Sequence, residues 1–128
     1  MNRTMLRSKI HRIQVTECEL EYEGSLTIDT ELMEAAGMVP FERVDIFDCE
    51  NGNRFSTYLI EGEAGSRVCC VNGAAARKVA KGDRLIMVSY CTLTDDEVAD
   101  HRPRVVVVGD KNEIKTVKDY ERAATRVG

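Results

Sequence analysis

Val44-Asp-Ile-Phe-Asp-Cys-Glu50 and Arg54-Phe-Ser-Thr-Tyr-Leu-Ile60 are two strand-like runs on either side of Asn51-Gly52. An Asn-Gly pair suits the two positive φ angles of a type I′ turn, the favoured connection of a two-residue β-hairpin. Alternating apolar and polar residues are typical of strands that bury one face. The sequence therefore predicts an antiparallel hairpin across residues 44–60.

Outward from this hairpin, short strands alternate with brief helices. Gly37 is expected to end a helix in the left-handed conformation, and Asp29 or Thr30 to cap its start. Six or more short strands with only brief helices indicate a mainly β protein, a compact β-barrel with short helices. The expected extended segments are 4–13, 15–22, 26–28, 68–71, 84–92 and 105–108, the expected helices are 31–36, a turn after 72–73 and a single turn at 94–97, and residues 116–126 are expected to be a weak surface helix or a loose tail.

The composition is that of one ordinary globular domain. The 128 residues are 43% apolar and 31% charged, and 18 bases against 22 acids give a net charge of −4. This balance gives no sign of nucleic acid as a partner, although it leaves room for a small basic pocket. No apolar run approaches the ~20 residues that span a bilayer. The N-terminus lacks the apolar region of a signal peptide, so a cytoplasmic location is expected.

The five cysteines do not form a metal-site pattern. They show no C-x-x-C spacing, and the chain has only two histidines. Adjacent Cys69 and Cys70 point to opposite faces of any strand. We therefore expect reduced structural thiols and no metal site.

Gly24-Ser25 separates the extended segment 15–22 from the strand at 26–28. Taken alone, this pair is an ordinary turn, because glycine and serine are common turn residues. Lys9 and His11 share one face of the first strand, about 7 Å apart. A solvated basic face explains that pair without any function.

Arg54 and Tyr58 share one face of the second hairpin strand, whereas Thr57 faces the other side. Cross-strand pairing on an exposed sheet explains the first two residues without any function. The turn at 72–75 offers backbone N–H groups that could bind a carboxylate, or it simply begins a helix. The chain contains no glycine-rich phosphate loop and no nucleophile elbow.

In this order and spacing, the motifs resemble those of the bacterial aspartate 1-decarboxylase family. The likeness covers about residues 1–115. The matching pieces are Arg3-Thr4-Met5-Leu6, Lys9 with His11, Tyr22-Glu23-Gly24-Ser25, Asn51-Gly52 with Arg54-Phe55-Ser56-Thr57-Tyr58, Gly65-Ser66-Arg67, Val71-Asn72-Gly73-Ala74-Ala75-Ala76 and Arg102-Pro103.

The resemblance implies a double-psi β-barrel domain at 1–115, a polar tail at 116–128 and a homotetramer. It also implies that the chain cuts itself between Gly24 and Ser25. The Ser25 hydroxyl attacks the Gly24 carbonyl, and elimination and hydrolysis then leave a covalent pyruvoyl cofactor at position 25. Thr57 is the family position that steadies the oxyanion of this rearrangement.

The implied reaction is the conversion of L-aspartate to β-alanine for pantothenate synthesis, through a Schiff base on the pyruvoyl group. Lys9 and Arg54 would hold the substrate carboxylates, and Tyr58 would return the proton. His11, Thr57 and the stretch Asn72, Gly73, Ala74 and Ala75 would line the substrate site. Phe47 stands where relatives often have tryptophan.

Two alternatives stay open. In the first, the chain is a non-enzymatic double-psi barrel, a binding or assembly module in which Gly24-Ser25 is only a turn. In the second, it is a precursor that stays uncleaved until an acetyltransferase-like maturation factor activates it.

Overall fold

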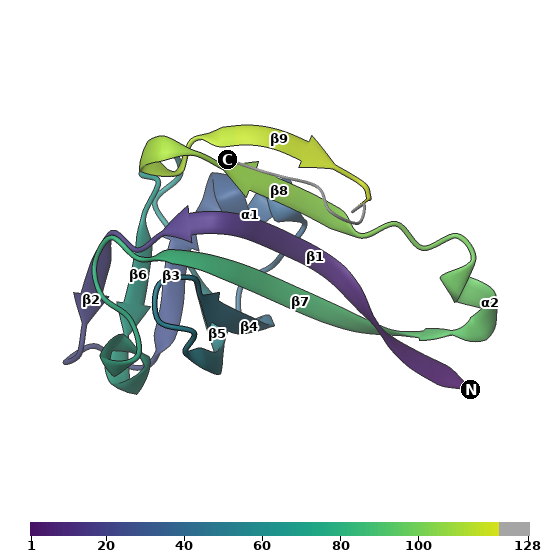
Figure 1. Cartoon of the computed structure of the whole chain (residues 1–128), viewed down its shortest axis with the longest axis horizontal. Helices are drawn as coiled ribbons and strands as arrows, with labels where there is room; N and C mark the ends of the chain where they lie inside the picture. The colour runs from purple at the N-terminus through teal and green to yellow at the C-terminus, as the bar shows by residue number, and fades with distance from the viewer. Residues whose placement is uncertain (121–128) are drawn as a thin grey trace.

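The computed structural model describes residues 1–120, which form one nine-stranded mixed sheet with short helices (Figure 1). In spatial order the strands run β2-β6-β3-β5-β4-β7-β1-β8-β9. The expected mainly β class is confirmed. Backbone pairing within the described residues does not join β2 to β9, so hydrogen bonds do not close this sheet into the expected barrel. The strands are β1 (Asn2–Gln14), β2 (Glu17–Glu19), β3 (Ser25–Asp29), β4 (Arg43–Asp48), β5 (Arg54–Gly62), β6 (Cys69–Asn72), β7 (Arg84–Thr94), β8 (Arg104–Val108) and β9 (Ile114–Lys118).

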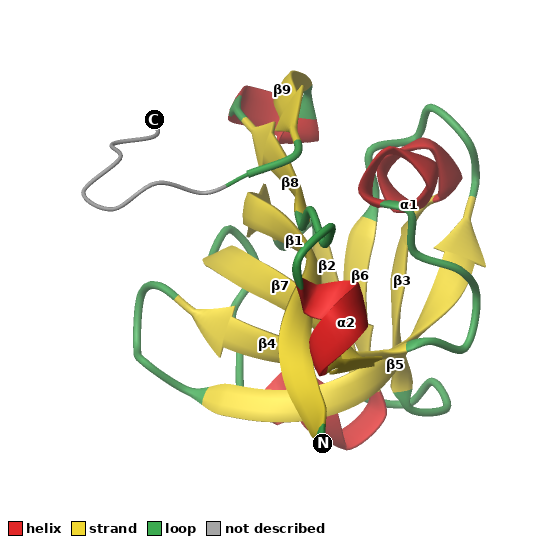
Figure 2. Ribbon diagram, turned by 90° about the vertical axis from the view of Figure 1, so that its right-hand side faces the viewer, coloured by secondary structure: helices red, strands yellow, loops and turns green. Residues whose placement is uncertain are grey.

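Four short helices connect these strands: α1 (Thr30–Ala36), η1 (Gly73–Arg77), α2 (Asp95–Val98) and η2 (Asp110–Asn112). Helix α1 follows β3 and packs against the curved sheet, whereas α2 lies at the far end of β7 (Figure 2). The Asp29 side chain caps α1, and Gly37 ends it with φ 70°, as predicted. A capping box begins α2 at Thr94. No helix among residues 1–120 has the length and apolar character needed to cross a bilayer.

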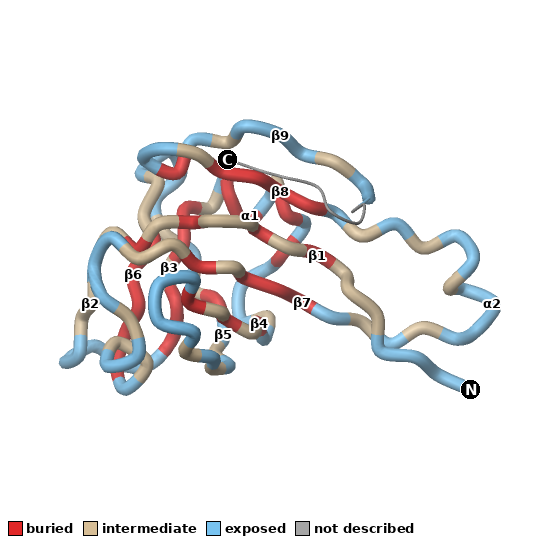
Figure 3. Tube along the Cα trace, viewed as in Figure 1, coloured by how far each residue is buried: buried red, intermediate tan, exposed pale blue. Residues whose placement is uncertain are grey.

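The core lies between the curved sheet and α1 (Figure 3). Strand β1 pairs with β7 and its register shifts at two places. The second shift is a bulge at Arg12, whose φ is 71°. This bulge lets Ile10 and Ile13 both face the core although they are three residues apart. The largest fully buried side chains are Ile10, Ile13, Val15, Leu26, Ile28, Leu32, Met33, Val44, Ile46, Leu59, Leu85 and Met87.

The predicted hairpin is confirmed as β4 and β5, but the predicted type I′ turn is wrong. Only Gly52 has a positive φ, at 76°, and Asn51 does not. The backbone of Asp48 closes a longer loop. Its carbonyl accepts from the Gly52 N–H and its N–H donates to the Asn53 carbonyl, both at 2.9 Å. The Asn51 side chain accepts from the Asn53 N–H at 2.8 Å, and this local bond holds Asn51 out of the left-handed region.

Two further expectations about the strands need correction. The extended segment expected at 15–22 is reduced to the three residues of β2. A weak helix or loose tail is expected from Thr116 onward, but this expectation is wrong for residues up to Lys118, which belong to β9 and pair antiparallel with β8. Strand β9 also spans residue 115, where the domain was expected to end. The sequence gives no alternating pattern here, because three of the five residues of this edge strand are polar and its central residues are all exposed. The expected tail at 121–128 lies outside the described residues.

The Asp29 carboxylate ties the end of β3 to the loop that leads into β6. Its side chain is fully buried and accepts from the backbone N–H groups of Glu31, Gly65 and Arg67, at 2.8, 3.1 and 2.7 Å. Burial by itself raises the pKa of this carboxyl, but the three donors and the Arg67 guanidinium outweigh burial and hold the pKa below its ordinary value. Asp29 therefore stabilises the fold in its charged form.

Replacing Asp29 with asparagine is expected to cost about 2 kcal/mol of unfolding free energy at neutral pH, because a charge-assisted set of hydrogen bonds is lost. The folded pKa lies below the unfolded one, so this difference between the two chains is full above about pH 5 and shrinks as the pH falls below about 4. Urea unfolding of both chains at a series of pH values measures the difference. A gap that widens in acid would contradict this assignment.

Candidate functional site

Ser25 begins β3 directly opposite Asn72, the last residue of β6. Both residues are buried, at 4% and 5% exposure. The Ser25 hydroxyl oxygen accepts a hydrogen bond from Asn72 Nδ2 at 3.2 Å. Its φ of 133° is a conformation that a residue with a side chain rarely adopts. Such strain costs on the order of 1–3 kcal/mol and persists only where the surroundings impose it.

Tyr58 lies on the other side of the Gly24–Ser25 bond. Strand β5 runs parallel to β3 with Leu26 opposite Leu59, which brings Tyr58 beside the start of β3. The Tyr58 hydroxyl donates to the Gly24 carbonyl oxygen at 3.2 Å. One donor therefore contacts the nucleophile oxygen, and another contacts the carbonyl that this oxygen would attack.

Thr57 takes the opposite face of β5, half-buried and paired with Val44. Within residues 1–120 its hydroxyl makes no hydrogen bond, so the donor at the Gly24 carbonyl is Tyr58. The alternation expected along this strand is thus observed.

Gly73 is required where β6 turns into η1. Its φ is 65°, and a Cβ built there would lie 2.8 Å from the Cα and 3.0 Å from the N of Gly24. Only glycine lets these two backbone segments approach so closely. Gly24 itself has nothing within 4 Å of a Cβ added to it. The space that the missing side chain of Gly24 leaves is therefore open.

Arg54 and His11 belong to a row of residues across four strands. The register pairs Arg54 with Phe47, and Phe47 with Ile86. Ile86 in turn pairs with His11, and Lys9 is two residues away on the same face of β1. Three strand spacings separate Arg54 from His11, which is about 14 Å. The Arg54 guanidinium lies 4.5 Å from the centroid of the Phe47 ring, a cation–π contact that holds the side chain over the sheet.

The structure thus brings some predicted site residues together and keeps others apart. Ser25, Gly24, Tyr58, Asn72 and Gly73 meet around one peptide bond. Residues 74 and 75 follow in η1, exposed and half-buried respectively. The cations of the candidate set share the outer face of the sheet formed by β1, β7, β4 and β5. Arg54, the cation on the same strand as Tyr58, is four residues from it, which is about 13 Å along β5.

Two residues in contact with this site were missed by the sequence reasoning. The Cys70 thiol donates to Asn72 Oδ1 at 3.1 Å, and Asn72 Nδ2 donates to the Thr27 hydroxyl at 3.1 Å. Each missed residue is two positions from a predicted one, on the same strand face. That spacing was the signal that could have identified them once β3 and β6 were known to pair.

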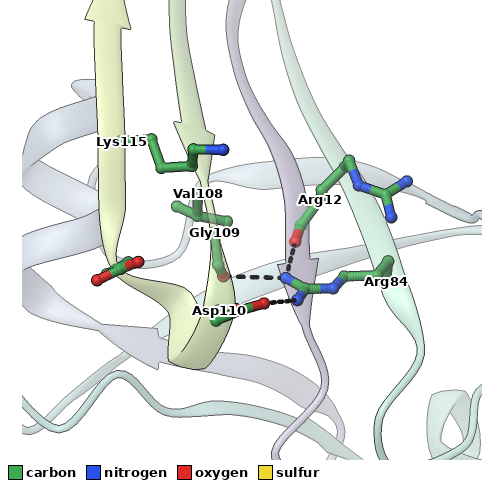
Figure 4. Close-up of a pocket in the computed structure, with 7 residues that line it drawn as sticks. Arg12, Arg84, Val108, Gly109, Asp110 and Lys115 are labelled. Carbon is green, nitrogen blue, oxygen red and sulfur yellow. Dashed lines mark hydrogen bonds and ion pairs between the residues drawn. The ribbon is translucent and has the colours of Figure 1, made fainter. Parts of the chain in front are cut away.

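A separate pocket of about 250 Å³ lies near the bulge of β1 (Figure 4). Its lining includes Arg12, Arg84 and Lys115, but no residue of β3, β5 or β6. The Arg84 guanidinium already donates to the carbonyls of Arg12 and Gly109, at 2.9 and 3.0 Å, and pairs with Asp110 at 3.4 Å. Arg84 therefore serves to join β1 to the β8–β9 turn. Among residues 1–120 no His, Cys, Asp and Glu cluster has the make-up of a metal site.

Comparison with known proteins identifies one family. The family model described as aspartate decarboxylase matches residues 1–115. An aspartate 1-decarboxylase of Clostridium acetobutylicum is 50% identical over 125 residues, which is 98% of each chain. A protein of the same description from Clostridium botulinum is 53% identical over 95% of this chain and 96% of its own, and one from Clostridium kluyveri is 48% identical over the same shares.

Proposed function

Since the chain belongs to the aspartate decarboxylase family and decarboxylates aspartate, we propose that it works through a pyruvoyl group made from its own Ser25. The product is β-alanine, the precursor that this family supplies for pantothenate. One observation carries the proposal. The Gly24–Ser25 peptide bond has a hydrogen-bond donor on the nucleophile oxygen and another on the carbonyl oxygen, at 3.2 Å each.

In the proposed self-processing, Ser25 Oγ attacks the Gly24 carbonyl carbon. The Oγ–C bond forms, the peptide C–N bond breaks, and the hydroxyl proton passes to the nitrogen. Loss of the Ser25 α-proton with cleavage of the Cβ–Oγ bond then releases a chain ending at Gly24. The unsaturated amine left at position 25 takes up water and releases ammonia, which leaves the pyruvoyl group.

The residues around Ser25 fit these steps. Asn72 Nδ2 faces the oxygen that gains negative charge, first as nucleophile and then as leaving group. The Tyr58 hydroxyl faces the oxygen of the tetrahedral intermediate. Thr57 remains the position that family resemblance proposes for the same task, from the other face of the strand. The strained φ of Ser25 favours a step that breaks its backbone bond to Gly24.

The same residues fit a pyruvoyl group, because the buried Asn72 amide offers a donor at position 25 and the exposed Tyr58 hydroxyl offers one beside it. When formed, the group supplies an electron sink for the electrons left by the departing carboxylate. Tyr58 is proposed to hold the proton that returns to the substrate carbon. Backbone groups of Gly73, Ala74 and Ala75 would border the substrate, together with the Asn72 amide.

Lys9 and Arg54 are proposed to bind the substrate carboxylates, with His11 beside them, in a site shared between copies of the chain. Within one chain the backbones of Arg54 and Tyr58 lie about 13 Å apart along β5, and the Arg54 guanidinium is held over the Phe47 ring of the neighbouring strand. A neighbouring copy that packs on the outer sheet face would bring these cations to the Ser25 site. We propose that this neighbouring copy belongs to a homotetramer of double-psi β-barrels.

Intact-mass analysis under denaturing conditions tests the proposal. The purified chain is expected to yield one piece ending at Gly24 and a second piece beginning at position 25. The second piece should be lighter by one ammonia than a chain that simply begins with serine. Gly65-Ser66 is the internal control, and it should stay uncut.

An unprocessed chain that is cut only after an acetyltransferase-like maturation factor is added would support the precursor alternative. A chain that stays whole even then, and makes no β-alanine, would leave the non-enzymatic barrel as the better account.

A further inference from the structure

Four side chains form a polar square between β6 and β3: the buried Cys70, Asn72 and Ser25, and the half-buried Thr27. The antiparallel register pairs Ser25 with Asn72, and Thr27 with Cys70. Residues two apart on a strand point to the same side, so all four share one face. The Asn72 amide uses both its oxygen and its nitrogen, because Oδ1 accepts from the Cys70 thiol while Nδ2 donates to the hydroxyl oxygens of Ser25 and Thr27.

We propose that Cys70 is a positioning residue for the self-processing of Ser25. Its S–H group, 3.1 Å from Asn72 Oδ1, holds the amide with the oxygen toward Cys70 and the nitrogen toward Ser25. The inference rests on the proposed function and assigns a role to a residue that has no part in the substrate site.

The orientation of the amide matters because its two ends do opposite things to a hydroxyl. With Nδ2 toward Ser25, an N–H donates to Oγ and stabilises the negative charge that develops there. With the amide turned over, Oδ1 would accept the hydroxyl proton and lower its reactivity. A thiol distinguishes the two orientations, since it donates to oxygen and is only a weak acceptor for an N–H.

The surroundings of Cys70 keep its thiol able to donate. The residue is 6% exposed. Burial, followed by the nearby Glu17 and Glu19 carboxylates, raises the pKa of its thiol to about 11. The thiol is therefore protonated at neutral pH. A buried amide oxygen without a donor is costly, which gives even a weak S–H group an influence on the orientation.

Cys69 provides a matched control in the same strand. It is fully buried but lies on the opposite face of β6, in the apolar core. Cys69→Ala removes a sulfur atom, as Cys70→Ala does, but this sulfur makes no hydrogen bond to Asn72. A structural role of either cysteine would lower stability, whereas only the role proposed for Cys70 would change the rate of self-cleavage.

The test follows the first-order rate of cleavage of purified precursor in three variants. Cys70→Ala is expected to slow cleavage about 10-fold, because the amide oxygen loses its donor. Cys70→Ser restores a donor and is expected to stay within about 3-fold of the unsubstituted rate. Cys69→Ala should cleave at the unsubstituted rate. Cleavage of Cys70→Ala at that rate, or equal slowing of Cys70→Ala and Cys70→Ser, would overturn the proposal.

A second measurement is independent of cleavage. In the uncleavable Ser25→Ala chain, a double-mutant cycle between Cys70→Ala and Asn72→Ala should show a coupling of about 5-fold in the unfolding equilibrium constant. A coupling near one would overturn the proposed contact. Failure of the unsubstituted chain to cleave under any condition would reject the proposed function, and the cycle would then decide whether Cys70 holds the Asn72 amide.

Discussion

The Ser25→Ala chain is expected to remain a single chain of 128 residues and to make no β-alanine above background. The reason is chemical: without Oγ no atom at this position can attack the Gly24 carbonyl, and no pyruvoyl group forms. The chain should still fold, because the methyl group that remains occupies the same buried place beside β6. Denaturing mass analysis after prolonged warming, with an assay for β-alanine, measures both outcomes.

Ser66→Ala is the matched control for this substitution, since Ser66 follows the only other glycine that precedes a serine. Its hydroxyl accepts from the Val68 N–H at 3.3 Å, in a loop outside the polar square. The Ser66 variant should cleave and turn over normally. Full β-alanine production by Ser25→Ala would refute the proposed origin of the cofactor.

The Tyr58→Phe chain is expected to be cut but to lose about 10²- to 10⁴-fold in turnover, the range for removal of a general acid. Cleavage continues because Ser25 and Asn72 remain, although it slows without the hydroxyl on the Gly24 carbonyl. The aromatic ring is kept, so packing on β5 changes little. Single-turnover cleavage and steady-state decarboxylation of the fully cut protein separate the two effects.

Tyr90→Phe supplies the control for the Tyr58 variant. Tyr90 is similarly exposed, at 45% against 42%, and lies on β7, which β4 separates from β5. Removing its hydroxyl should leave turnover unchanged. Normal turnover in Tyr58→Phe would eliminate this residue as the proton donor, without affecting the assignment of Ser25.

Local chemistry explains which parts of the fold could be predicted from sequence. Asp29 and Gly37 bound a helix by capping rules that depend on neighbouring residues alone, and both predictions are confirmed. The turn at Asn51 failed because its side chain forms a bond that the Asn-Gly rule does not consider. Strand β9 was missed because its pairing with β8 outweighs its polar composition.

The site was harder to predict because it depends on contacts between distant segments. Family resemblance suggested Ser25, Tyr58 and Asn72 as site residues, but spacing along the chain could not pair β3 with both β5 and β6. That pairing alone brings the Tyr58 hydroxyl to the Gly24 carbonyl and the Asn72 amide to the serine. Cys70 enters the site through the same register, which no local pattern reports.

The position of β1 has a consequence for how the protein folds before and after the proposed cut. This strand of 13 residues lies between β7 and β8, in the part of the chain that precedes the proposed cut. Before cleavage its insertion into the sheet is an intramolecular event. Afterwards it is a separate peptide that would have to find its place by diffusion, at a rate that depends on concentration. The proposed self-processing would therefore make folding a one-way event, because the cut protein would be held together by a sheet that only the uncut chain can assemble easily.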